Sequence, residues 1–145
     1  MTARISPASA TPLSVALLVL RLATGAVFIA HGYQKLFQRG IAGVTHSFGG
    51  MGVPLPEVVA PVVSVLEFAG GIALILGVLT RIVAVGLAVD MLGAMLIAHL
   101  PHGFFLPRGI EFTMMLFAAS VALALAGAGA YSIDASLAAR RARLD

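Results

Sequence analysis

The sequence has 145 residues, of which 60% are hydrophobic and only 10% are charged, and its mean hydropathy is +1.05. These values exclude an ordinary soluble domain and place the chain in a lipid bilayer. The net charge of +3 comes without a long basic run, which argues against nucleic-acid binding. The absence of cysteine excludes disulfides and thiolate metal sites, so a redox function would need a bound cofactor or substrate.

The first predicted membrane span covers residues 13–31, an apolar run interrupted by Arg21 and Thr24. Pro12 suits the first position of that helix, where a missing N–H is tolerated. Residues 32–56 are rich in glycine and include two prolines, which favours a long, partly re-entrant first loop over a packed span.

Three further spans are predicted at residues 57–79, 82–100 and 110–127, and Thr80 and Arg81 connect two of them tightly. Ser132 is suited to cap a short interfacial helix at residues 133–144, inside a C-terminal tail of residues 132–145. We therefore predict an all-α membrane protein: one domain over residues 1–145, folded as an antiparallel bundle of four transmembrane helices.

Basic residues are more frequent on the side that carries both termini than on the opposite side. The first group is Arg4, Arg81, Arg140, Arg141 and Arg143, and the second is Lys35, Arg39 and Arg108. Because basic loops stay on the cytoplasmic side, we predict a multi-pass protein of the inner cell membrane with both termini in the cytoplasm.

Three ionisable residues, Arg21, Glu67 and Asp90, lie near the middle of predicted spans. Each unpaired charge there would cost about 2.5 to 3.5 kcal/mol. We expect Arg21 to pair with Glu67 across antiparallel spans, while Asp90 either carries a proton or shares Arg21. Glycines one turn away would let the helices approach: Gly25, Gly70 and Gly71. The alternative is that these charges only fix the helix register and bind no ligand.

A second polar cluster is expected where the spans end at the other membrane face: His31, Lys35, His99, His102 and Glu111. Imidazoles and a carboxylate there could hydrogen-bond and protonate a quinone carbonyl, with Phe104 and Phe105 covering the ring. Alternatively, each histidine only bonds backbone or water at the interface. Met91 and Met95 read as ordinary packing, so haem ligation by His31 and His99 is disfavoured and no metal site is predicted.

Several motifs together resemble the DoxX family over about residues 13–134. They are HGYQKLF at 31–37, GVPLP at 52–56, EFAGG at 67–71, HLPHGFF at 99–105, GIE at 109–111 and GAGAYSID at 127–134. The resemblance implies a four-helix membrane protein often described as an oxidoreductase. Relatives include a subunit of a thiosulfate:quinone oxidoreductase and members that form membrane complexes with oxidative-stress enzymes.

The leading hypothesis is a quinone-linked subunit of a redox complex that docks a catalytic partner protein and is not catalytic alone. In it Arg21 and Glu67 hold the interior, while the candidate catalytic residues Asp90, His99, His102 and Glu111 relay protons or contact the ligand head. The rivals are a proton-coupled transporter or binding protein for a small molecule or lipid, in which Glu67 and Asp90 change protonation, and a non-catalytic membrane anchor. Small-residue faces permit a homodimer: Gly86 with Gly93, and Gly127 with Ala130.

Overall fold

The computed structural model describes residues 7–144, and every regular element in that range is helical. The elements in chain order are α1 (Pro7–Tyr33), η1 (Gln34–Arg39), α2 (Gly40–Gly50), α3 (Pro56–Leu76), α4 (Thr80–Gly93), η2 (Ala94–His99), η3 (Leu100–His102), α5 (Glu111–Ala126) and α6 (Ile133–Arg141). The prediction of an all-α fold is confirmed. Arg4, used above to predict orientation, lies outside the described residues.

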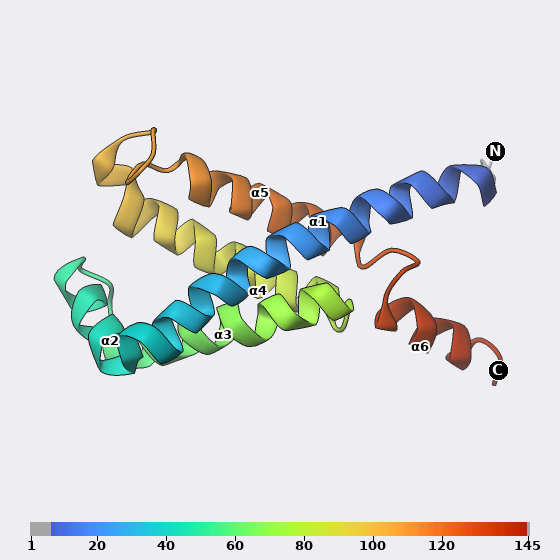
Figure 1. The fold of residues 1–145 in the computed structure, drawn as a ribbon, viewed down its shortest axis with the longest axis horizontal. Helices are drawn as coiled ribbons and strands as arrows, with labels where there is room; N and C mark the ends of the chain where they lie inside the picture. The colour runs from blue at the N-terminus through green and yellow to red at the C-terminus, as the bar shows by residue number, and fades with distance from the viewer. Residues whose placement is uncertain (1–6, 145) are drawn as a thin grey trace.

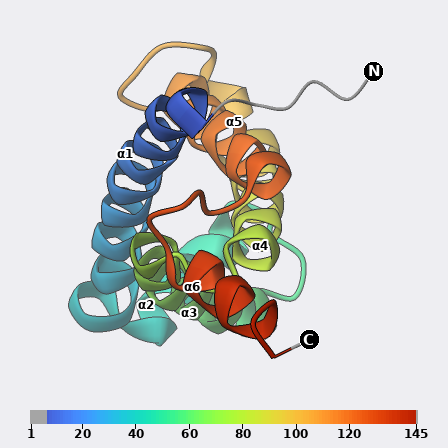
Figure 2. The same cartoon turned by 90° about the vertical axis from the view of Figure 1, so that its right-hand side faces the viewer.

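The long helices form two closely packed pairs (Figures 1 and 2). α1 lies along α3, and α4 lies along α5, while contacts between the pairs are sparser. The start of α1 and the whole of α6 lie at one end of the molecule, and α2 and the connection from η3 to α5 lie at the other. The two ends of the molecule are therefore built from different segments of the chain.

Three helical stretches are long and apolar enough to cross a membrane: Pro12–Gly50, Pro56–Leu76 and Thr80–His102. Large apolar side chains point outward from all of them and from α5, as at Val19, Val62, Val85 and Met115, each more than half exposed. Lipid would cover such a surface. At 16 residues, α5 is about 24 Å long, shorter than the ~30 Å hydrocarbon core, so the fourth span stays a prediction.

The long loop predicted over residues 32–56 is wrong for most of its length. The chain stays helical through α1, η1 and α2 as far as Gly50, and only residues 51–55 connect to α3. A glycine inside a helix costs only about 1 kcal/mol, which the packing of a side chain such as Val44, fully buried, can offset. The helix also begins earlier than predicted, at Pro7, with Pro12 inside it.

Glycine contacts fix how α1 and α3 pass each other. A Cβ atom at Gly25 would lie 2.7 Å from the carbonyl oxygen of Gly71, and one at Gly32 would lie 2.4 Å from the backbone nitrogen of Phe68. Only glycine allows backbones this close. The predicted close approach is confirmed at Gly25 and Gly71, whereas Gly70 faces Val83 of α4.

The predicted cap of the last helix is confirmed. The Ser132 hydroxyl accepts a hydrogen bond from the backbone amide of Ala135 at 3.1 Å, as an N-cap residue does. The helix that follows, α6, ends at Arg141 and is shorter than predicted.

Candidate functional site

Arg21 does not pair with Glu67, so that prediction is wrong. The Arg21 side chain is buried, and its Nη2 donates to the carbonyl oxygen of Tyr131 at 2.6 Å. A Cβ atom added at Gly77 would lie 2.1 Å from Arg21 Nη1, so the guanidinium sits at the turn after α3. Gly77 is ten residues beyond Glu67, about 15 Å along a helix. The glycine contacts explain the error: Gly25 lies against Gly71 and Gly32 against Phe68, which places Arg21 beside the end of α3 and not beside Glu67.

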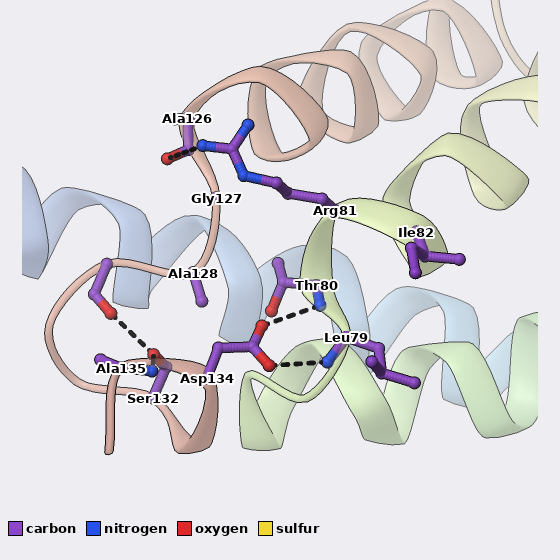
Figure 3. Close-up of a pocket in the computed structure, with 11 residues that line it drawn as sticks. Leu79, Thr80, Arg81, Ile82, Ala126, Gly127, Ala128, Ser132, Asp134 and Ala135 are labelled. Carbon is purple, nitrogen blue, oxygen red and sulfur yellow. Dashed lines mark hydrogen bonds between the residues drawn. The ribbon is translucent and has the colours of Figure 1, made fainter. Parts of the chain in front are cut away.

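Asp134 is the residue that sequence reasoning missed at this end (Figure 3). Its carboxylate accepts hydrogen bonds from the backbone amides of Leu79 and Thr80, both at 2.9 Å, and so caps the start of α4. Its own amide donates to the carbonyl oxygen of Gly77 at 2.9 Å. A cap supplied from 54 residues away leaves no local sequence signal. We call the contacts of Arg21, Leu79, Thr80 and Asp134 the terminal latch.

The electrostatics of the latch favour an ionised Asp134. Burial alone would raise the pKa of this carboxyl, but hydrogen bonds from Thr80 and Leu79 and the positive charge of Arg21 outweigh it. The net result is a pKa below the ordinary value of aspartate. The latch thus holds the C-terminal segment against the turn between α3 and α4 with a negative charge at a helix N-terminus, where the helix dipole stabilises it.

Arg81 joins the same end of the molecule to α5 (Figure 3). Its Nη2 donates to the carbonyl oxygen of Ala126 at 3.4 Å, the bond drawn in the figure. Its Nη1 donates to the carbonyl oxygens of Leu125 at 2.8 Å and Ala124 at 3.1 Å, which satisfies groups left free at a helix C-terminus. Gly127 is buried against Arg81, and Gly86 faces Leu66 of α3. These two glycines therefore serve contacts within the chain, whereas a Cβ atom at Gly93 would meet nothing within 4 Å and Ala130 is exposed, so the homodimer stays a prediction.

At the opposite end of the described bundle, Glu67 pairs with Lys35. Lys35 Nζ contacts Glu67 Oε2, and the two side chains are 15% and 3% exposed. Asp90 of α4 interacts electrostatically with both, and its Oδ2 is buried without a hydrogen-bond partner among the described residues. One lysine therefore serves two carboxyl groups. We call these three residues the Lys35 cluster.

A cavity of about 120 Å³, the inner cavity, lies beside this cluster. It is lined by Phe28, His31, Lys35, Glu67, Met91, Ala94, His99, Phe112, Thr113 and Leu116. Ionisable groups from three helical segments face the cavity together with aromatic and aliphatic side chains. Such a mixture, mostly apolar with a few convergent polar groups, is typical of small-molecule sites.

A hydrogen bond to the backbone fixes which ring nitrogen of His99 remains available for other partners. Its Nδ1 lies 2.8 Å from the carbonyl oxygen of Arg108. Because a carbonyl only accepts, Nδ1 carries the proton of this bond, and Nε2 is left for other partners. In the neutral ring Nε2 accepts a hydrogen bond, and in the protonated ring it donates one.

Two of the polar residues that line the inner cavity, Lys35 and His99, belong to π-helical turns. Lys35 lies in η1 and His99 ends η2. Such wide turns are rare in helices and frequent at functional sites. They change the direction in which the following side chains point, and hydropathy patterns give no sign of them.

The five residues predicted to converge do so only in part. His31, Lys35 and His99 line the inner cavity. His102 is exposed and its Nδ1 lies 3.1 Å from the carbonyl oxygen of Ala98, while Glu111 accepts from the amide of Leu106 at 2.6 Å. These two instead hold the turn between η2 and α5. Phe104 and Phe105 pack edge to face on each other, exposed, outside the cavity wall.

Sequence comparison then decides the family. The model of the DoxX family matches residues 16–100, more than half of the chain. This chain belongs to the DoxX family. The DoxX match spans Arg21, the Lys35 cluster and His99, and it confirms the resemblance found in the motifs.

Curated relatives agree with the membrane assignment. The chain is 35% identical over 117 residues to "Putative oxidoreductase CatD" of Bacillus subtilis (strain 168), covering 81% of this chain and 83% of the relative. It is 37% identical over 125 residues to "Inner membrane protein YqjF" of Escherichia coli (strain K12), covering 83% and 90%. No solved structure matches this DoxX protein. We conclude that the chain is a multi-pass membrane protein with a relative named as an oxidoreductase.

Proposed function

We propose that this DoxX protein is the membrane subunit of a redox complex, which binds a quinone in the inner cavity and docks a catalytic partner protein. The observation that carries the proposal is that the Lys35–Glu67 pair and two histidines line one small, otherwise apolar cavity. The name of the Bacillus subtilis relative, "Putative oxidoreductase CatD", agrees with it.

The walls of the cavity suit the edge of one ring. An apolar cavity of roughly 150 Å³ is known to bind benzene, so a cavity of about 120 Å³ would take the carbonyl-bearing edge of a quinone ring, with the rest of the ring and its tail outside the cavity. Phe28, Met91 and Leu116 would pack on the ring. Lys35 would donate a hydrogen bond to a quinone oxygen, and His99 Nε2 would exchange a hydrogen bond or proton with the other.

Reducing a quinone to a quinol takes two electrons and two protons. The Lys35 cluster, His31 and His99 are the groups beside the cavity that can supply or accept protons. The electrons would come from the docked partner, because the sequence holds no cysteine for thiol redox chemistry or iron–sulfur ligation. Asp90, in electrostatic contact with both members of the pair, would set how readily a proton moves.

The proposal includes an orientation. The end with the terminal latch carries Arg81, Arg140 and Arg141, so we assign it to the cytoplasm, with α5 as the fourth span. The inner cavity then lies toward the opposite face of the membrane.

A pair of histidine variants tests the quinone site. The protein is purified in mild detergent with its partners, and organic extracts are assayed for quinone by mass spectrometry. We expect quinone in the wild type and in His102→Ala, whose side chain lies outside the cavity, and a severalfold loss in His99→Ala. Absence of quinone from the wild type, or equal retention in both variants, would refute the proposal. A haem band in the optical spectrum would identify a different cofactor.

A further inference from the structure

A second cavity lies on the other side of the Lys35 cluster. Its volume is about 230 Å³, and it is enclosed by α2, the residues that follow it, α3, α4 and η2. We call it the α2 cavity. It is lined by Phe48, Met51, Val53, Val59, Val63, Val89, Asp90, Gly93, Ala94, Ile97 and Ala98. It shares only Ala94 with the inner cavity among these described residues, so it is a separate site.

Asp90 is the only polar side chain among the described residues that line the α2 cavity. Its Oδ2 is buried without a hydrogen-bond partner. A buried polar atom without a partner is costly, and Lys35 is already engaged by Glu67, whose carboxyl group also lies within hydrogen-bond reach of the Asp90 carboxyl. The α2 cavity therefore offers an apolar volume beside a single carboxyl group, one oxygen of which lacks a partner within the described chain.

We propose that the α2 cavity binds a small, mostly apolar molecule that carries a hydroxyl group, and that Asp90 is the hydrogen-bond partner of this hydroxyl. A hydroxyl donates to an ionised carboxylate and accepts from a protonated one, so it satisfies Asp90 in either state. A carbonyl group could bond only the protonated acid, and an ammonium group is matched only to the ionised one. A hydroxyl group can therefore bond Asp90 whatever its protonation state, whereas a carbonyl or an ammonium group cannot.

The volume of the α2 cavity limits the size of the ligand. A dry cavity of roughly 150 Å³ binds benzene, so one of about 230 Å³ takes a substituted single ring or a branched alcohol of similar size. The proposal does not depend on quinone binding, because Lys35, Glu67, His31 and His99 do not line the α2 cavity.

Gly93 provides a way to fill the α2 cavity without a backbone clash. A Cβ atom added at Gly93 meets no other atom within 4 Å, and the residue lines the cavity. Gly93→Phe should therefore place a ring in the space that the ligand would occupy. Val85→Phe is the matched control, because Val85 lies on the same helix, is 53% exposed and does not line the cavity.

The experiment uses a photoactivatable diazirine derivative of benzyl alcohol on the full chain in lipid nanodiscs. Peptide mass spectrometry locates the labelled residues, which separates binding in the cavity from partitioning into lipid. Thymol and p-cymene then compete with the probe, since the two differ only in the hydroxyl group of thymol.

We expect saturable labelling of residues 48–63 and 89–98, lost in Gly93→Phe and retained in Val85→Phe. Thymol should compete about tenfold better than p-cymene, because the hydrocarbon can form no hydrogen bond to the carboxyl group in either protonation state. Asp90→Leu should remove this preference. Labelling that never saturates, or labelling that Gly93→Phe leaves unchanged, would overturn the site. Equal competition by thymol and p-cymene in the wild type would overturn the role of Asp90, and this comparison needs no variant to fold.

Discussion

Replacing Lys35 by methionine is expected to destabilise the protein by about 3–5 kcal/mol, the usual cost of removing one partner from a buried ion pair. The structure supports the upper half of this range. Glu67 is 3% exposed in its side chain, so water cannot take the place of the lysine, and Asp90 loses the same positive charge. Glu67→Gln should destabilise the protein less, because Lys35 still interacts electrostatically with the Asp90 carboxyl group.

A double-mutant cycle separates the observed pair from the one predicted by sequence. Lys35→Met combined with Glu67→Gln should show a coupling energy of about 2–3 kcal/mol, whereas Arg21→Met combined with Glu67→Gln should be additive within ~0.5 kcal/mol. Unfolding in mixed detergent micelles can be followed by the fluorescence of Tyr33 and Tyr131, since the chain has no tryptophan. Coupling between Arg21 and Glu67, or none between Lys35 and Glu67, would refute the arrangement described here.

Three further predictions concern packing and the terminal latch. Gly71→Ala should lower the free energy of unfolding by about 1–3 kcal/mol, because its Cβ would lie 2.7 Å from the carbonyl oxygen of Gly25. Gly43→Ala is the control: its nearest atom is 3.9 Å away, so it should change the free energy of unfolding by less than ~0.5 kcal/mol. Equal effects of the two variants in the same micelle titration would contradict the close approach. The pKa of Asp134 is lowered on folding, so its stabilisation is present above the ordinary value of 3.8 and is lost as the pH falls through the lower folded value. Asp134→Asn should unfold more easily than wild type at pH 6, and the difference in stability should shrink as the pH is lowered below 3.8. A difference that stays constant over this acid range would count against the ionised cap. Ser132→Ala should cost about 1 kcal/mol and speed amide exchange at Ala135, and unchanged exchange there would argue against the cap.

Much of the architecture can be read from the sequence because it depends on local properties. Hydropathy places the long spans in lipid, and Ser132 marks the start of α6. A tight connection between the second and third spans is also predicted, but it lies at residues 77–79, because Thr80 and Arg81 already belong to α4. Each of these signals lies within one or two turns of the element that it specifies. The motifs that identify the family are also local, and the family match confirms them.

The partners of the buried charges could not be read in the same way. Hydropathy gives the extent of a span but not its register against a neighbour, and a shift of ten residues moves a side chain by about 15 Å. Here the glycine contacts of α1 with α3, the unbroken helix through Tyr33 and the wide turn of η1 together move Lys35, rather than Arg21, to Glu67.

The sequence by itself determined that this chain is a helical membrane protein of the DoxX family with ionisable groups inside its spans. Only the tertiary structure decided which of them meet: Arg21 joins the carbonyl of Tyr131 beside Asp134, and Lys35 joins Glu67 and Asp90 between two cavities. The physical reason is that a charge in a membrane requires a partner nearby in space, and nearness in space depends on how helix backbones pack.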